Sequence, residues 1–372
     1  MKLSIIKTLT HSLIALFVLI GAQAVQANTG KAFSIKGKAL VNDEPLTLGT
    51  TLKAGDKIVT GDKSAVRVVM KDGTVIDIQE NSGFKITQYT FKEEAPEESS
   101  SAFDIFGGAV RYISGLIAKK DPTKVKLSAG TATIGIRGSF MNINTGVTVG
   151  QSDGAGMTAL SVLSSVGQAT VTLPDGSTLD VVAGQIGTIN TNTGASSTAA
   201  AASDPIAAAA IAMANNPENA AAAIANISDA DAALAIAALV NNATQLGATK
   251  ESVLAAVSKA VASKPSAAVG AAYITSALSP ADAATFAATI AAAAPDQADA
   301  INAASNSGKT LDPAPASTTS AFNLREGIDG EVIVTLEDGT EVTIENNNPG
   351  GTPLTTQQIQ EQLEILNSPS GG

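Results

Sequence analysis

One short unit occurs three times along this chain: an alternating run, an Asp-Gly turn and a second alternating run. The copies lie at residues 65–78, 169–181 and 332–344. Asp-Gly supplies the positive φ angles that a tight hairpin turn needs, and Val, Ile and Thr favour strands. We therefore predict three β-hairpins of one design, whose turns hold Asp72, Asp175 and Asp338.

The chain changes composition in its middle. From Lys31 to about Ile189 it is dense in Val, Ile, Thr and Gly, with short alternating runs, which predicts a mainly-β domain over residues 31–190. We expect a short β-solenoid or a sandwich of hairpins. Over residues 204–306 alanine dominates, and alanine is the strongest helix former, so this region is predicted to be all-α. The predicted fold class is therefore α+β, with more than one domain.

The alanine-rich region repeats loosely. Similar short segments surround Pro217, Pro265 and Pro295, and similar Ser-containing segments begin at Ser228 and Ser279. Proline is tolerated in the first turn of a helix and serine is a good N-cap, so both signals mark helix starts. We predict short helices in a bundle or array with a repeat of about fifty residues. The alternative is a set of alanine helices that acts as a spacer.

The remaining segments connect or follow these regions. Residues 191–203 and 307–320 are predicted linkers, residues 321–346 carry the third hairpin, and residues 353–367 form an amphipathic pattern typical of a helix. A lone hairpin is marginally stable in water, so we expect the third hairpin to add to the first sheet. We expect the C-terminal helix to pack on the body of the protein, with partner docking as the alternative.

The N-terminal residues have the pattern of a secretory signal peptide. Lys2 and Lys7 precede an apolar run that ends in small residues, which predicts removal of residues 1–27, with cleavage after Ala24 as the alternative. The apolar run is about half as long as a membrane-spanning helix of roughly 20 residues, so we expect no transmembrane anchor after cleavage. The protein is predicted to be exported, either to the periplasm or to the cell surface or the extracellular medium.

Composition excludes several kinds of chemistry. The chain has no Cys and no Trp, and its one histidine, His11, lies in the predicted signal peptide. Histidine triads, Cys-His pairs and zinc sites of the usual type are therefore excluded from the mature protein. The net charge of −11 makes nucleic acid an improbable partner. We expect no cofactor and no metal. Residues 151–156 suggest calcium, but they lack the closely spaced oxygen ligands that calcium loops carry.

Several ordered motifs in the β region resemble the FecR domain family. They are residues 52–60, the first hairpin, the segment Gly107-Gly108-Ala109-Val110, and residues 128–140, which contain Gly135-Ile136-Arg137-Gly138-Ser139. The family pattern ends in Arg-Gly-Thr, and here it ends in Arg-Gly-Ser. The resemblance covers roughly residues 52 to 143, and the second hairpin extends it. It implies an extracytoplasmic binding domain. The regulators that name the family also have a spanning helix and a cytoplasmic segment that grips a sigma factor, neither of which we predict here.

The residues of these motifs are interpreted as structural. Asp72 and Gly73 belong to a turn, and Gly135 and Gly138 are expected to let the backbone turn tightly around Arg137. We expect Arg137 to hydrogen-bond to carbonyl groups or to a carboxylate and so to fix that turn. The alternative is that Arg137 recognises an anionic ligand. No catalytic residue is predicted.

The sequence favours a non-enzymatic exported binding or assembly module, with a protein or another component of the cell envelope as its partner. The first alternative is a sensor or accessory component of a FecR-type transmembrane signalling system. The second is a hydrolase of envelope polysaccharide, whose paired carboxylates a sequence does not reveal. Such sites usually carry aromatic platforms, and this chain is only 3% aromatic.

Overall fold

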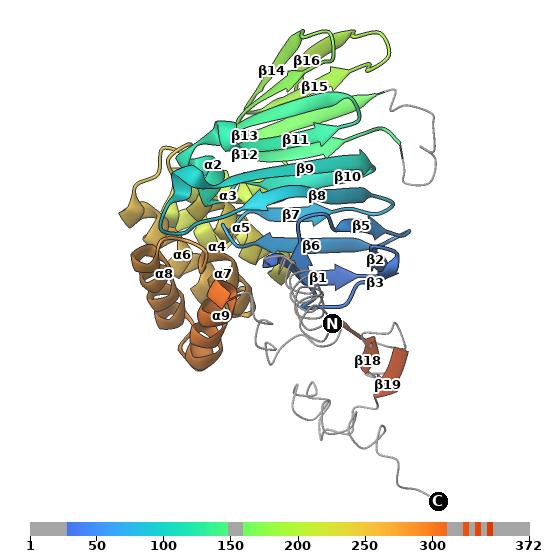
Figure 1. The fold of residues 1–372 in the computed structure, drawn as a ribbon. Helices are drawn as coiled ribbons and strands as arrows, with labels where there is room; N and C mark the ends of the chain where they lie inside the picture. The colour runs from blue at the N-terminus through green and yellow to red at the C-terminus, as the bar shows by residue number, and fades with distance from the viewer. Residues whose placement is uncertain (1–27, 148–158, 311–322, 327–331, 336–340, 345–372) are drawn as a thin grey trace, which may run out of the picture.

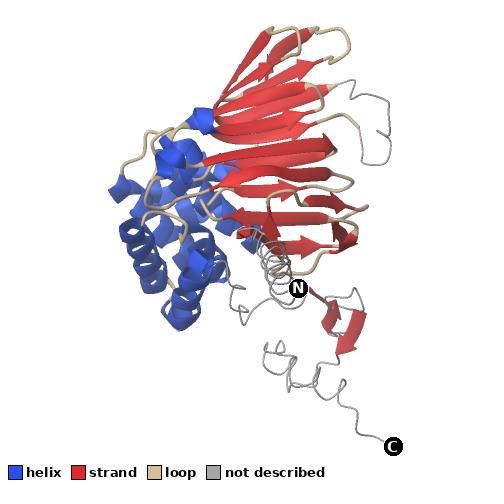
Figure 2. Cartoon of the chain, in the orientation of Figure 1, coloured by secondary structure: helices blue, strands red, loops and turns tan. Residues whose placement is uncertain are grey.

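Sixteen strands form one sheet that folds into two facing layers, and helices cover part of one layer (Figures 1 and 2). The computed structural model describes residues 28–147, 159–310 and three further short strands. The predicted fold class, a mainly-β region followed by an alanine-rich helical region, is confirmed. The signal peptide, residues 151–156 and the C-terminal helix lie outside the described residues.

Strand pairing defines the two layers. Layer A contains β3 (Glu44–Pro45), β2 (Ala39–Val41), β5 (Lys57–Thr60), β8 (Gly83–Thr90), β9 (Ser100–Gly107), β11 (Val125–Ala129) and, at its far edge, β14 (Thr178–Val182). Layer B contains β4 (Thr51–Lys53), β1 (Asn28–Lys36), β6 (Ala65–Met70), β7 (Val75–Ile78), β10 (Ala109–Ile113), β15 (Gln185–Ile189) and β16 (Ser196–Ala200). Among these neighbours only β9 and β11 are parallel.

Two long strands belong to both layers. The first part of β12 (Ala132–Asn144) pairs with β11 in layer A, and its second part pairs with β10 in layer B. The next strand, β13 (Leu160–Thr172), likewise pairs with β15 in layer B and then with β14 in layer A. The register between them shifts from Arg137 to Phe140, so a bulge marks the place where both strands change layers.

Glycine is required at this bulge. Gly138 has φ +54° and Gly167 has φ +75°, values that residues with a Cβ rarely adopt. A Cβ on Gly167 would also lie 2.0 Å from the carbonyl oxygen of Gly138. The two glycines therefore allow β12 and β13 to bend together and close the sheet into two layers.

The core between the layers follows from alternation along the strands. Val66, Val68 and Met70 of β6 and Ile76 and Ile78 of β7 alternate along their strands and are buried on the face between the layers, while the residues between them are buried on the outer face. Side chains of layer A meet them, and among them the rings of Phe84 and Phe103 lie 5.4 Å apart. Each buried Val, Ile or Phe side chain contributes about 1.5–3 kcal/mol relative to an exposed one.

The helices form two rows. One row contains α3 (Pro205–Asn215), α5 (Asp229–Asn241), α7 (Ala268–Thr275) and α9 (Ala298–Thr310); the other contains α4 (Ala220–Ile224), α6 (Lys250–Ser263) and α8 (Pro280–Ala293). Within each row, successive members pack on each other, so the array interpretation is confirmed. None of the described helices is long and apolar enough to span a bilayer.

The predicted helix starts are also present. Pro217, Pro265 and Pro295 each open a short 3₁₀ turn that leads into a helix. The Ser228 and Ser279 hydroxyls accept hydrogen bonds from the backbone N–H groups of Asp231 and Asp282, three residues further on. Both serines therefore cap their helices as the sequence indicates.

The structure differs from the sequence expectations in two places. Residues 191–203 were predicted to be a linker, yet they contain β16, because the Ser-Thr-Ala run pairs with β15. The mainly-β region also contains a short helix, α2 (Leu116–Lys120). The third hairpin, β18 (Val332–Thr335) and β19 (Glu341–Ile344), does not extend the first sheet: it pairs with β17 (Asn323–Glu326) in a separate three-stranded sheet.

Candidate functional site

The outer face of layer B, the face turned away from layer A, divides into three rows across neighbouring strands. Register places Val69, Val75, Ile113 and Phe140 in an apolar row. The next row along the strands holds Arg67, Asp77, Arg111 and Asn142. The third, polar row holds Ala65, Gln79, Ala109 and Asn144.

The apolar row is covered by the helices. Val69, Val75, Ile113 and Phe140 belong to one buried cluster with residues such as Ile206, Leu234 and Tyr273 of the helical region. Figure 2 shows the helices gathered at one end of the strands, which is the end of this row. The sheet and the helical array therefore share a hydrophobic core.

The charged row binds the helix starts to the sheet. The Arg67 guanidinium donates to Asp77 Oδ1 at 2.6 Å and to Asp77 Oδ2 at 3.0 Å. Its remaining nitrogen donates to the Ala230 carbonyl in the first turn of α5 at 2.8 Å. Arg111 donates to Asp77 at 2.8 Å and to Asp204 at 2.8 Å, while Asp204 also accepts from Ile206 N and caps α3.

Burial and charge act against each other in this row. Burial alone would raise the pKa of Asp77, but Arg67 and Arg111 hold that pKa below its usual value. Burial alone would lower the pKa of both arginines, and the facing carboxylates raise it instead. Asp77 therefore stays ionised and the row remains a chain of alternating charges. Since these groups satisfy one another, we interpret them as structural.

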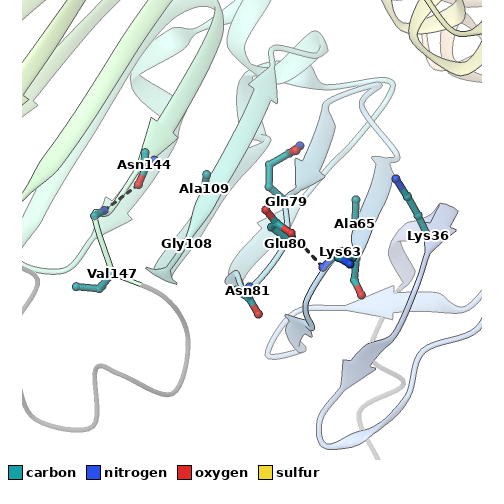
Figure 3. A pocket seen from close by; sticks show the side chains of 12 residues that line it. Lys36, Lys63, Ala65, Gln79, Glu80, Asn81, Gly108, Ala109, Asn144 and Val147 are labelled. Carbon is teal, nitrogen blue, oxygen red and sulfur yellow. Dashed lines mark hydrogen bonds between the residues drawn. The ribbon is translucent and has the colours of Figure 1, made fainter.

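The third row is open and forms a groove. It has a volume of about 810 Å³, and Figure 3 shows Lys36, Lys63, Gln79, Asn81 and Asn144 around it. The floor is formed by the short side chains of Ala65 and Ala109, which leave the strand ends accessible. The groove is thus the part of the layer B face that the helices leave uncovered.

The groove has a definite chemistry. Two lysines stand on the β1 and β6 side, and amide side chains of Gln79, Asn81 and Asn144 follow toward β12. Glu80, also in the lining, accepts a hydrogen bond from the Lys63 backbone N–H at 3.0 Å. Such a surface offers ammonium and amide donors, amide acceptors and the Glu80 carboxylate to a polar chain. In the described part of the molecule, no group of three or more His, Cys, Asp or Glu side chains could hold a metal ion.

The first predicted turn is deeply buried rather than exposed. Asp72 is 1% exposed and accepts from Thr74 N, Thr74 Oγ1, Tyr89 Oη and Ile117 N. Burial raises the pKa of Asp72, and these hydrogen bonds oppose the rise. Gly73 has φ +77°, and its carbonyl accepts from Asn241 Nδ2 of α5. The turn therefore joins both layers, α2 and the helical array.

Next to this turn, Lys119 of α2 reaches the C-terminal end of α5. Its Nζ lies 3.3 Å from both the Val240 carbonyl and Asn241 Oδ1. A cation at a helix C-terminus is favourable. Burial lowers the pKa of Lys119 to about 8.

The Arg137 motif lies at the bulge, but only partly as expected. Gly138 has the positive φ of a sharp bend, whereas Gly135 pairs regularly with Lys126 and Thr170, so the expected turn at Gly135 is wrong. The Arg137 side chain is exposed. Across the part of the chain whose side chains are described, no hydrogen bond or ion pair from Arg137 is seen. The bend is fixed by glycine geometry, and the expected role of Arg137 in holding it finds no support.

The other turns are simpler. Asp175 accepts from Ser177 N at 2.9 Å and from Ser177 Oγ at 2.6 Å, which is an exposed Asx turn. These hydrogen bonds lower the pKa of Asp175. Asp338 lies outside the described residues.

Sequence reasoning missed both the charged row and the groove. A hairpin centred on Asp72 and Gly73 places Arg67 opposite Asp77, so opposite charges in facing strands could have signalled the pair. The groove residues carry no such signal. They come from separate strand ends and loops, and only the folding of the sheet brings them together.

The fold and its groove define a two-layer β module with a helical array on one face. Residues 56–165 match the family model described as FecR protein, so the chain carries a FecR domain. This confirms the resemblance that the motifs indicated.

Comparison with solved structures gives a weaker likeness. Two crystal structures of a "putative anti-sigma factor" from Parabacteroides distasonis, at 2.50 Å and 1.65 Å resolution, match 41% of this chain at 16% identity. Their TM-scores are 0.32 and 0.31, and the match spans 62% and 63% of their own length. No curated protein matches the chain.

Proposed function

We propose that this protein is a non-enzymatic binding module that acts outside the cytoplasm and holds its partner in the groove on layer B. The observation that carries the proposal is the division of one sheet face. Helices cover its apolar end, buried ion pairs close its middle, and the polar end is left open as a groove of about 810 Å³. The FecR domain over residues 56–165 supports an extracytoplasmic binding role.

The structure around the groove suits recognition. Its floor lies on β6 and β10, which belong to a run of hydrogen-bonded strands that leads from β6 through β7 and β10 to β12. A rigid floor reduces the ordering cost of binding. Lys36 and Lys63 favour a partner segment that carries acidic groups, and the amides suit its main chain.

A crosslinking experiment tests this site. The full chain, produced in the cells that encode it, would carry a photoreactive residue at exposed Lys36 on the rim of the groove. The matched control carries the same residue at exposed Lys126 in β11 of layer A. We expect one discrete adduct from position 36 and none from position 126. Equal labelling from both positions, or no adduct from position 36, would contradict a groove-bound partner.

Export is part of the same proposal. Mass spectrometry of the chain recovered from its producing cells should find a mature N-terminus at residue 28, in the fraction released from the envelope or the medium. A chain that keeps residues 1–27 and remains in the cytosol would remove the basis for an extracytoplasmic partner.

A second candidate function is favoured by the family match: a sensor or accessory component of a FecR-type signalling system. The crosslinked partner separates the two. A membrane-spanning regulator in the position 36 adduct would support signalling, whereas a surface or secretion protein would support assembly. Turnover of an envelope polysaccharide by the purified chain would argue against both.

A further inference from the structure

Among the described residues, the two-layer sheet has four edge strands with one unpaired side, and these edges differ in how they are protected. A free edge exposes unpaired N–H and C=O groups, and proteins usually block it with charges, proline, shortness or irregularity. One end of the sheet has the edges β3 and β4, and the other end has β14 and β16.

Three of the edges carry such protection. The two-residue strand β3 consists of Glu44 and Pro45. The three-residue strand β4 includes Lys53 and pairs irregularly with β1. The β14 edge holds the charged Asp180, which accepts from Thr170 Oγ1 at 2.6 Å.

The fourth edge, β16, has none of these devices. Its five residues, Ser196 to Ala200, pair with β15 in regular register, and all five are exposed. They include no charge and no proline, and the sequence has no charged residue from 181 to 203. Figure 1 shows β16 beside β15 at the end of the sheet opposite to β3 and β4.

From this contrast we propose that β16 is a strand-pairing surface, and that its partner is β16 of a second copy of this chain, in antiparallel register. Charge favours this occupant. With a net charge of −11, two copies repel each other over most of their surfaces, and the uncharged segment 181–203, which contains β16, is where they can meet at least cost. An antiparallel strand pair related by a two-fold axis is self-complementary. Pairing would continue layer B from one copy into the other.

The contact area of a five-residue edge sets the expected strength. Interfaces below about 1,200 Å² are usually transient. We therefore expect a reversible dimer, whose fraction rises with protein concentration. Sedimentation velocity of the full mature chain, from about 1 to about 300 µM, should show a shift from monomer to dimer mass in this range. A chain that stays monomeric throughout would overturn the proposal.

Charge exchange on β16 identifies the partner strand. In the variant S197K/T198K, both β16 strands of a pair carry positive charges that face each other and repel. In the variant S197E/T198E, both strands carry negative charges that repel in the same way. We expect each variant alone to be monomeric and an equal mixture of the two to restore the dimer. The control T51K/T87K adds the same charge at exposed positions of β4 and β8 and should dimerise normally.

Other outcomes would exclude β16 pairing with itself. If the mixture stays monomeric while wild type dimerises, β16 binds some different strand. If both β16 variants dimerise as wild type does, the contact lies elsewhere. Circular dichroism confirms that the variants fold, and folding is expected because the substituted side chains are exposed.

Discussion

At the scale of single residues, this protein depends on a few positions where backbone geometry or buried charge leaves little freedom. Gly138 and Gly167 bend the two strands that belong to both layers. Asp77 lies between two arginines, each of which also binds the start of a helix. These positions connect the sheet fold to the helical array, and the groove lies beside them.

Replacing Gly167 by alanine should strongly destabilise the fold. A Cβ there would lie 2.0 Å from the Gly138 carbonyl oxygen, and the positive φ adds strain of about 1–2 kcal/mol. The matched control is Gly176→Ala, where φ is +83° and nothing lies within 4 Å of the added carbon. Urea denaturation should show a clearly larger loss for Gly167→Ala. Equal losses would mean that the bulge tolerates the added atom.

Replacing Asp77 by alanine should lower the free energy of unfolding by about 3–5 kcal/mol, because Arg67 and Arg111 remain buried without their shared carboxylate. The exposed pair of Lys92 and Glu98 provides a control, and Glu98→Ala should change stability little. Denaturant titration of both variants measures the difference. A loss no larger than that of Glu98→Ala would contradict the structural role of the charged row.

The contribution of Asp77 should also depend on pH. Because its folded pKa is lowered, the stabilisation is present above the unfolded pKa of about 3.9 and is lost as pH falls through the lower folded value. The stability difference between wild type and Asp77→Asn should therefore be constant near neutral pH and shrink in acid. If the stability difference instead grows as the pH falls, the pKa of Asp77 is raised by folding rather than lowered.

At the scale of elements, capping and strand register decide how the helices meet the sheet. The helix α5 begins at the charged row, where Arg67 binds the Ala230 carbonyl, and it ends where Asn241 binds the Gly73 carbonyl. It therefore crosses the apolar row between two polar anchors. Most of its residues are buried, although alanine gives it thin side chains that allow close packing.

Loss of the α5 cap should be measurable. Ser228→Ala removes the acceptor of the Asp231 N–H and should cost about 1 kcal/mol. Ser258→Ala, in the interior of α6, is the matched control and should be neutral or slightly stabilising, since alanine is the better helix former. Thermal unfolding compares the two. A Ser228→Ala variant as stable as Ser258→Ala would mean that the cap contributes nothing.

At the scale of the whole molecule, the β region and the helical region pack closely on each other. They share one hydrophobic cluster through Val69, Val75, Ile113 and Phe140, and the charged row crosses the same boundary. Removing the helices would expose these apolar side chains and leave Arg111 without Asp204. A cut between regions at residues 191–203 would also remove β16 from its sheet.

We therefore expect cooperative unfolding of the two regions. Hydrogen exchange of the full chain should give amides of β6, β7 and α5 similar, near-global protection. A variant without residues 204–310 should aggregate or expose apolar surface rather than fold as an independent β domain. Clearly lower protection of α5 than of β6, together with a stable folded β fragment, would show two independent domains.

The sequence alone was enough to predict the strand-rich and alanine-rich regions, the Asp-Gly hairpins and the caps at Ser228 and Ser279, because those depend on local backbone preference and period. It also contained the FecR motifs. Only the tertiary structure decided that β12 and β13 belong to two layers, that Asp72 is buried, and that β16 forms from a predicted linker. The groove depends entirely on the tertiary structure, because Lys36, Gln79 and Asn144 are far apart in the chain. These residues come together only at the end of the folded sheet that the helices leave uncovered. Local pattern specifies elements, whereas long-range packing specifies which of their faces remain open.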